Sequence, residues 1–165
     1  MKKISEELTR KTYINPLIKE AGFNLDGDKD LEYEVKGMPN DKGIGYVDYV
    51  LWGNDGLPLA VVEAKKTIRS PKEGKHQAKL YADCLEKEVK RRPVIYYTNG
   101  YEHWFWDDTN YPSRNVQGFH TKDQLELMMQ RRTGRLSLAS VKINNEIVER
   151  SYQHTAIRKV TEAFE

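Results

Sequence analysis

One segment constrains this chain most: an apolar run that ends abruptly in charge and follows a matching strand and a tight turn. Residues 57–65 read Leu-Pro-Leu-Ala-Val-Val-Glu-Ala-Lys, and residues 46–52 are rich in aromatic and β-branched side chains. Between them stands Asn54-Asp55-Gly56, which is typical of a tight turn joining antiparallel strands. We therefore predict a β-hairpin over residues 46–65, with a second strand apolar enough to lie centrally in a sheet.

Helical and strand patterns surround this hairpin. Helix-start signals or apolar residues three and four positions apart predict helices over residues 5–22, 72–90, 121–131 and 151–164. Strand patterns cover residues 31–36, 94–98 and 102–106, whereas 38–45 and 107–120 are predicted to be loops. In the first helix Leu8 belongs to the expected apolar face, and Pro16 predicts a kink near Asn15. This order predicts an α/β fold with a mixed central β-sheet flanked by helices.

Composition bounds the class of protein. The 165 residues give room for one ordinary domain with an appended piece, and the net charge of +2 excludes a histone-like polycation. A single cysteine, Cys84, excludes an intramolecular disulfide and fits a reducing compartment. No apolar run approaches membrane-spanning length, and no signal peptide is expected.

The charge is distributed unevenly along the chain. Residues 1–64 carry 8 basic and 12 acidic side chains, a net charge of −4. Residues 65–92 carry 10 basic and 4 acidic ones, a net charge of +6, and the remainder is neutral. The near-zero total therefore leaves nucleic-acid binding open.

Charged residues where the apolar strand ends are the candidates for chemistry. Side chains alternate along a strand, so Glu63 and Lys65 are expected to share one face. If the two strands pair, Asp48 reaches the same end of the sheet, which assembles two carboxylates and an ammonium group. Two carboxylates suit Mg²⁺ with a bound water and a substrate phosphate, and Lys65 would stabilise developing phosphate charge. The alternative interpretation is a solvated strand end with an ordinary ion pair.

The helix that follows adds polar residues near this end. Gln77 and Tyr81 lie four residues apart and so share a helix face. Both suit contacts with phosphate or a metal-bound water, and the alternative is a surface glutamine beside a half-buried tyrosine. The basic residues of this region suit phosphate contacts that position DNA without reading its sequence, or else form a solubilising face. They are Lys65, Lys66, Arg69, Lys72, Lys75, His76 and Lys79.

Taken together, these segments resemble the N-terminal nuclease domain of the R (HsdR) subunit of type I restriction-modification enzymes. That domain belongs to a RecB-like branch of the PD-(D/E)xK nuclease superfamily. The resemblance runs from about residue 5 to residue 130 and is carried, in order, by residues 46–52, 57–66, 77–82, 98–100 and 104–107. It implies a restriction-endonuclease-like core. Val47 departs from the proline in the superfamily's name, but that proline supplies no ligand.

The resemblance also implies site residues. Asp48, Glu63 and Lys65 occupy the family's catalytic positions, and Gln77 and Tyr81 fall on its Gln-x-x-x-Tyr motif.

The ligands implied for Mg²⁺ are Asp48 and Glu63, with the carbonyl of Ala64 as an additional ligand. Glu6 matches an acidic residue of the family's first core helix, and Glu7 is the competing register. The histidines show no spacing typical of a zinc site.

The end of the chain, residues 149–160, is similar to the opening of the helicase-like ATPase that follows the nuclease in these subunits. There the pair Tyr152 and Gln153 would match residues that hold adenine, although an ordinary terminal helix is the plainer interpretation here. No Gly-x-x-x-x-Gly-Lys-[Ser/Thr] motif occurs, so ATP is expected to serve only the full-length subunit. We expect an endonuclease domain over residues 1–132, a linker over 133–149 and the start of a truncated helicase-like ATPase domain over 150–165.

The resulting hypothesis is a Mg²⁺-dependent DNA endonuclease domain in the prokaryotic cytoplasm. Its expected partners are double-stranded DNA and the methyltransferase and specificity subunits, with no membrane. It would cut unmodified DNA with little sequence preference of its own, coupled to translocation by the motor. Three alternatives stay open: a stand-alone RecB-like repair nuclease, a non-catalytic DNA-binding or docking module, and a nuclease that is idle without its partner subunits.

Overall fold

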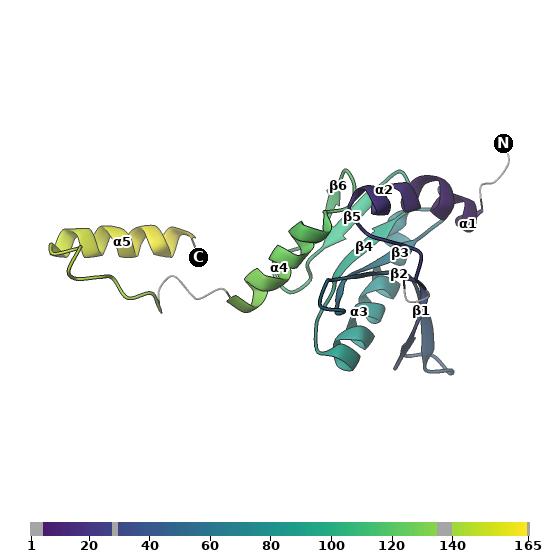
Figure 1. Cartoon of the computed structure of the whole chain (residues 1–165), viewed down its shortest axis with the longest axis horizontal. Helices are drawn as coiled ribbons and strands as arrows, with labels where there is room; N and C mark the ends of the chain where they lie inside the picture. The colour runs from purple at the N-terminus through teal and green to yellow at the C-terminus, as the bar shows by residue number, and fades with distance from the viewer. Residues whose placement is uncertain (1–4, 28–29, 135–139, 165) are drawn as a thin grey trace. The chain divides into compact units, whose positions relative to one another are not determined.

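The predicted hairpin is present in the computed structural model, at the centre of a six-stranded sheet (Figure 1). The strands are β1 (Leu31–Lys36), β2 (Ile44–Trp52), β3 (Pro58–Ala64), β4 (Val94–Thr98), β5 (His103–Trp106) and β6 (Arg114–Val116). They lie side by side in sequence order. All neighbours are antiparallel except β3 and β4, which run parallel because a helical crossover joins them. The predicted α/β class with a mixed sheet is confirmed.

The structure describes residues 5–27, 30–134 and 140–164, and the chain divides into two compact units, Met1–Leu127 and Met128–Glu165. The first unit contains the whole sheet. Part of the expected linker, residues 135–139, lies outside the described residues.

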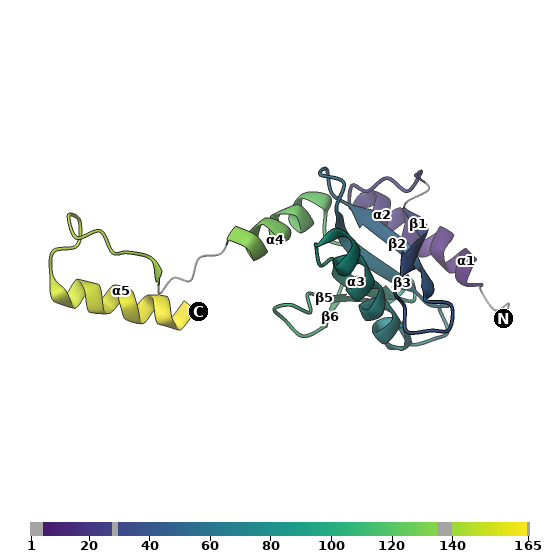
Figure 2. The same cartoon turned by 90° about the horizontal axis from the view of Figure 1, so that it is seen from below.

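Helices cover the two faces of the sheet in the first unit (Figures 1 and 2). One face carries α1 (Glu6–Thr9), the π-helical turn η1 (Arg10–Ile14) and α2 (Asn15–Glu20). The other face carries the short 3₁₀ turn η2 (Pro71–Gly74) and α3 (Lys75–Val89). The side chain of Ser5 caps α1 by accepting a hydrogen bond from the amide of Leu8 at 3.1 Å.

The core follows from these two layers. Apolar residues of α3, among them Ala78, Ala82 and Leu85, pack in one cluster with Val61 and Ile95 of the central strands. β3 is buried along its whole length, as expected for a strand with a neighbour on each side and helices over both faces. The charged end of β3 is therefore held between packed layers.

Four details differ from the sequence predictions. The expected loop over 107–120 contains β6, which is short and exposed and so lacks an apolar alternation. β2 begins at Ile44, inside the other expected loop. Leu8 was expected on the apolar face but is 50% exposed, and Thr9 is buried instead. A kink was expected near Asn15, but the helix changes its geometry earlier. The π-helical turn begins at residue 10 and shifts the helical register there.

Two α-helices follow the sheet in the part of the chain that the structure describes. α4 (Lys122–Gly134) begins where Thr121 caps it, since the amide of Gln124 donates to the Thr121 hydroxyl at 3.3 Å. α5 (Ser151–Phe164) lies in the second unit and confirms the predicted terminal helix. Within the ranges given above, no helix combines the length and apolar character needed to cross a membrane.

Candidate active site

Asp48 lies where β2 meets the end of β3. One of its carboxylate oxygens, Oδ2, accepts a hydrogen bond from the backbone amide of Ala64 at 2.7 Å. Val47 and Val50 lie close to this position and are both buried in the core cluster. The residue after Asp48, Tyr49, pairs in register with Val62, which brings Asp48 beside the end of β3.

Glu63 and Lys65 share a face, as predicted, and are bound to each other. Nζ of Lys65 lies 2.5 Å from Oε1 of Glu63. Glu63 is only 2% exposed, and its second oxygen, Oε2, is buried without a hydrogen-bond partner among the described residues. A solvated strand end is thus the wrong interpretation for Glu63, because its carboxylate lies inside the fold.

Gln77 and Tyr81 extend this pair into a chain of hydrogen bonds. Nζ of Lys65 donates to Oε1 of Gln77 at 3.0 Å, and Nε2 of Gln77 donates to the hydroxyl of Tyr81 at 2.6 Å. Tyr81 is 3% exposed, so the alternative of a half-buried tyrosine beside a surface glutamine is wrong. The chain of bonds fixes the ammonium of Lys65 between a carboxylate and an amide.

Two glycines allow the helical side to lie close to these residues. A Cβ on Gly74, the last residue of η2, would lie 2.8 Å from Cγ of Glu63 and 3.2 Å from Cε of Lys65. A Cβ on Gly45 would lie 2.7 Å from Cε1 of Tyr81. Side chains at either position would displace the site, which explains why these positions suit glycine.

Arg10 is a site residue that the sequence analysis missed. Its Nη1 donates to Oδ1 of Asp48 at 3.0 Å, and its Nη2 donates to Oε1 of Glu32 at 2.9 Å. The available sequence signal was its spacing, since Arg10 follows Glu6 by four residues on the first helix. A separation of 38 residues from Asp48 gave no reason to pair the two.

The two competing glutamates of the first helix differ in position. Glu6 is partly buried and raises the pKa of both Asp48 and Glu63, so it lies on the site's side of the helix. Glu7 is exposed and pairs with Lys11 at 2.7 Å. The structure therefore favours the Glu6 register for proximity to the site.

Burial dominates the electrostatics. Desolvation, together with the charge of Asp48, raises the pKa of Glu63 to about 7. Desolvation also raises the pKa of Asp48, against the opposing effects of the Ala64 amide and Arg10. Burial alone would lower the pKa of Lys65, but its bond to Glu63 and the surrounding carboxylates raise it. The carboxylates of the site thus carry more negative charge than the neighbouring cationic side chains neutralise.

These residues suit a divalent cation held by two carboxylates. The unpartnered Oε2 of Glu63 and the raised pKa values of both acids are what a bound cation would relieve. Mg²⁺ is commonly bound through one or two carboxylates, with water and substrate filling the other positions. Across the described residues, no three or more His, Cys, Asp or Glu side chains are grouped to hold a metal. Glu6 therefore does not complete a three-carboxylate cluster with Asp48 and Glu63.

The basic residues beside the site divide into two kinds. Arg69 pairs with Glu73 at 3.4 Å, and Lys79 pairs with Asp83 at 3.5 Å. Lys72 and Lys75 instead lie over the indole rings of β5. Their Nζ atoms are 4.6 Å from the Trp104 ring centroid and 4.5 Å from that of Trp106, respectively. Their ammonium groups therefore lie over β5, which is separated from β3 by β4.

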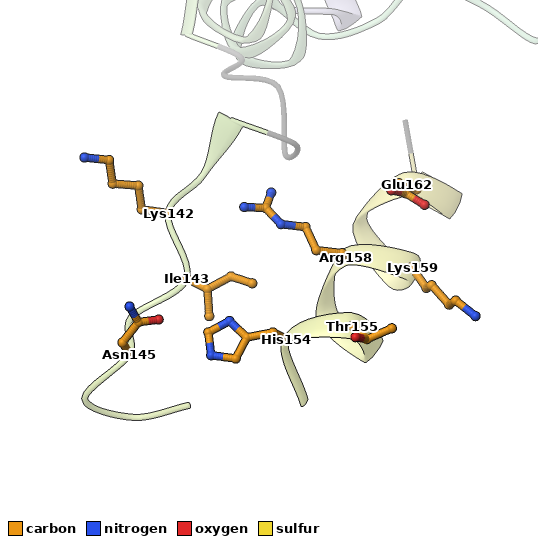
Figure 3. A pocket seen from close by; sticks show the side chains of 8 residues that line it. All are labelled: Lys142, Ile143, Asn145, His154, Thr155, Arg158, Lys159 and Glu162. Atoms are coloured by element: carbon orange, nitrogen blue, oxygen red, sulfur yellow. The ribbon is translucent and has the colours of Figure 1, made fainter. Parts of the chain in front are cut away.

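A separate hollow of about 580 Å³ lies in the second unit, between residues 142–145 and α5 (Figure 3). Its lining is mainly polar and basic, with Lys142, His154, Arg158 and Lys159. It contains none of the predicted catalytic residues. It is therefore not part of the site built around Asp48 and Glu63.

Comparisons with known proteins identify a family and a solved structure that this chain resembles. A model of the family described as the type I restriction enzyme R protein N terminus (HSDR_N) matches residues 5–121. A solved fragment assigned to an HsdR subunit of a type I restriction enzyme from Vibrio vulnificus YJ016 is 27% identical, with a TM-score of 0.66. The similarity covers 97% of this chain but 32% of that one, so this chain spans about a third of its length. No curated protein matches the chain.

Proposed function

The chain belongs to the family of type I restriction enzyme R protein N termini, and from this membership we propose that its first unit is a Mg²⁺-dependent DNA endonuclease domain. The observation that carries the proposal is the cluster of Asp48, Glu63 and Lys65 at the end of β3. The proposed substrate is unmodified double-stranded DNA, cut with little intrinsic sequence preference. We expect the activity in the prokaryotic cytoplasm, within a complex with methyltransferase and specificity subunits.

Asp48 and Glu63 would hold the metal through their carboxylates, together with the carbonyl of Ala64. When bound, the metal supplies a water of lowered pKa and a positive charge against the scissile phosphate. The Ala64 amide orients Asp48 through the 2.7 Å bond to Oδ2, and burial of Glu63 keeps bulk water away from its carboxylate. Both effects fix the ligands before DNA arrives.

Lys65 would stabilise the negative charge that develops on the phosphate. Its ammonium is kept in place by Glu63 and Gln77, and Gln77 is itself held by Tyr81. The raised pKa of Lys65 means that the group stays protonated near neutral pH, so its role is that of a fixed cation. Gln77 and Tyr81 act through Lys65 and are positioning residues.

The test is DNA cleavage by the complete complex of R, methyltransferase and specificity subunits with ATP and Mg²⁺. We expect Asp48→Ala and Lys65→Ala to lose about a hundredfold or more of the cleavage rate while ATP hydrolysis is retained. Asp48→Asn keeps the side-chain shape near Arg10 and Ala64, and it should also lose cleavage. Lys36→Ala, an exposed lysine of β1, is the matched control and should cut normally.

Cutting at the full rate by both Asp48→Asn and Lys65→Ala would overturn the proposal and favour a non-catalytic DNA-binding or docking module. Cleavage by this chain alone, without ATP or partner subunits, would favour a stand-alone repair nuclease. The family match favours the R-subunit proposal over that alternative.

A further inference from the structure

Arg10 links two carboxylates, one inside the candidate site and one at its rim. Its side chain is 18% exposed and lies between Asp48, at 15%, and Glu32, at 67%. The two bonds use different nitrogens of one guanidinium, Nη1 for Asp48 and Nη2 for Glu32. The arginine is therefore held by an inner and an outer acceptor at the same time.

Both ends of this link rest on unusual backbone. Arg10 is the first residue of the π-helical turn η1, a conformation that is rare and frequent at functional sites. Glu32 has φ of 49°, in the left-handed region that residues other than glycine seldom adopt. A strained position is retained when the surrounding structure gains from it, and here the Glu32 carboxylate reaches Arg10.

Arg10 also binds the Asp48 oxygen that does not accept the Ala64 amide. Oδ2 of Asp48 accepts the Ala64 amide, and Oδ1 accepts Arg10. A divalent cation and a guanidinium repel each other strongly at the distance set by one shared oxygen in a partly buried site. Binding of the cation by Asp48 therefore competes with the Arg10 bond.

We propose that Arg10 is a resident cation that holds the metal's place on Asp48 and moves onto Glu32 alone when a divalent cation binds. In the metal-free protein the guanidinium balances the charge of Asp48. On loading, the Nη1 bond to Asp48 is given up, and the bond to Glu32 keeps the arginine at the rim of the site. This inference rests on the proposed function, because it takes Asp48 to be a metal ligand.

The test is Mg²⁺ binding to this chain without DNA, measured by isothermal titration calorimetry. Arg10→Gln removes the competing cation, so we expect Mg²⁺ to bind at least about fivefold more tightly than to the wild type. Glu32→Gln removes the outer acceptor and leaves Arg10 on Asp48, so we expect binding at least about threefold weaker. Glu32 is exposed, so this variant remains informative even if Arg10→Gln does not fold.

Lys11→Gln is the matched control. It removes one positive charge from the neighbouring residue, which is exposed and pairs with Glu7 away from Asp48, and we expect unchanged Mg²⁺ affinity. The proposed exchange of Arg10 for a divalent cation on Asp48 would be overturned by either of two results. One is unchanged or weaker Mg²⁺ binding by Arg10→Gln, and the other is unchanged or tighter Mg²⁺ binding by Glu32→Gln.

Asp48→Asn separates this result from failure of the proposed function. If the wild type binds Mg²⁺ and Asp48→Asn does not, the result supports the metal site on which the exchange depends. If neither the wild type nor Arg10→Gln shows saturable Mg²⁺ binding, the proposed metal site itself fails, and the exchange fails with it.

Discussion

Glu63 is only 2% exposed, and its carboxylate lies close to that of Asp48. Burial and the charge of Asp48 together raise the pKa of Glu63 from 4.5 to about 7. The folded protein therefore binds this proton more tightly than the unfolded chain does. The stability associated with neutral Glu63 is fully present below about pH 4.5 and is lost as the pH rises through about 7. Above pH 7 the loss corresponds to roughly 3 kcal/mol of unfolding free energy.

Glu63→Gln should therefore make the metal-free chain more stable at pH 8, because a neutral side chain replaces a buried charge. We expect the free energy of unfolding to rise by roughly 2 kcal/mol. The amide oxygen still accepts a hydrogen bond from Lys65, but it binds the ammonium more weakly than a carboxylate does. The advantage should shrink toward zero near pH 4.5. Urea unfolding in EDTA across this pH range measures it. The exposed Glu34→Gln is the control, and an advantage that does not depend on pH would contradict the prediction.

Tyr81→Phe tests whether the chain of hydrogen bonds positions Lys65. The variant removes the hydroxyl that accepts from Gln77 at 2.6 Å and leaves the buried ring in place. We expect cleavage by the complete complex to fall about tenfold, with a Tm change within about 3 °C, because one hydrogen bond is worth about 1 kcal/mol. Tyr46→Phe, whose ring is exposed, should cut normally. Equal rates for both variants would show that Tyr81 has only a packing role.

The sequence predicts contacts between neighbours in a regular strand or helix. The Glu63–Lys65 and Gln77–Tyr81 pairs follow from a period of two and from a spacing of four. The Arg10–Asp48 bond does not, because it spans 38 residues and depends on a π-helical turn. That turn has no clear signature in the side chains.

Among the elements, the buried ones were predictable and the marginal ones were not. β3 and β4 read as strands because an apolar run bounded by turn residues has few other ways to be buried. β6 is a three-residue exposed strand at the edge of the sheet, held by pairing with β5. Its existence depends on a neighbour's free edge and not on its own sequence.

Gly74→Ala tests the close approach of η2 to β3. The added Cβ would lie 2.8 Å from Cγ of Glu63, so the two elements must separate or the carboxylate must turn. Gly74 has φ of −82°, which alanine adopts without strain, so we attribute any effect to contact with the site. We expect Mg²⁺ affinity to fall at least about fivefold, measured by calorimetry. Gly118→Ala has open space around its added Cβ and should bind Mg²⁺ normally.

Lys72 and Lys75 test the contribution of η2 and the start of α3 to DNA binding. If their ammonium groups contact phosphates, Lys72→Gln and Lys75→Gln should each weaken DNA binding about equally for all sequences. Each should also reduce the slope of log K against log salt concentration by about one. Fluorescence anisotropy of this chain with a labelled duplex in EDTA measures both. Lys42 is an exposed lysine before β2, and Lys42→Gln is the control. An unchanged slope for both Lys72→Gln and Lys75→Gln would contradict the prediction.

Over the whole molecule, the small net charge of +2 hides a division by position. The acidic first segment supplies Asp48 and Glu63, and the basic segment that begins at Lys65 supplies η2 and α3. Part of that basic segment is neutralised within the fold, because Arg91 binds Asp55 at 2.7 Å and Arg92 binds Asp83 at 2.6 Å. Counting charges along the sequence therefore predicts the presence of a basic region but overestimates how much of it can meet DNA.

The fold and the candidate site both depend on the first unit of the chain. All six strands and every candidate site residue lie within Met1–Leu127, and α4 runs on to Gly134. A chain of residues 1–134 should therefore unfold cooperatively within about 3 °C of the Tm of the 165-residue chain and bind Mg²⁺ with the same affinity. A chain of residues 1–121 lacks α4, the Lys122 amide bond to the Ala21 carbonyl at 2.9 Å, and the fully buried Leu125. Truncating a buried leucine to alanine already costs about 2–5 kcal/mol, so this shorter chain should lose roughly 10 °C or more of its Tm. Calorimetric unfolding of the three chains is the measurement, and a large loss of Tm already at residues 1–134 would show that the fold depends on the second unit.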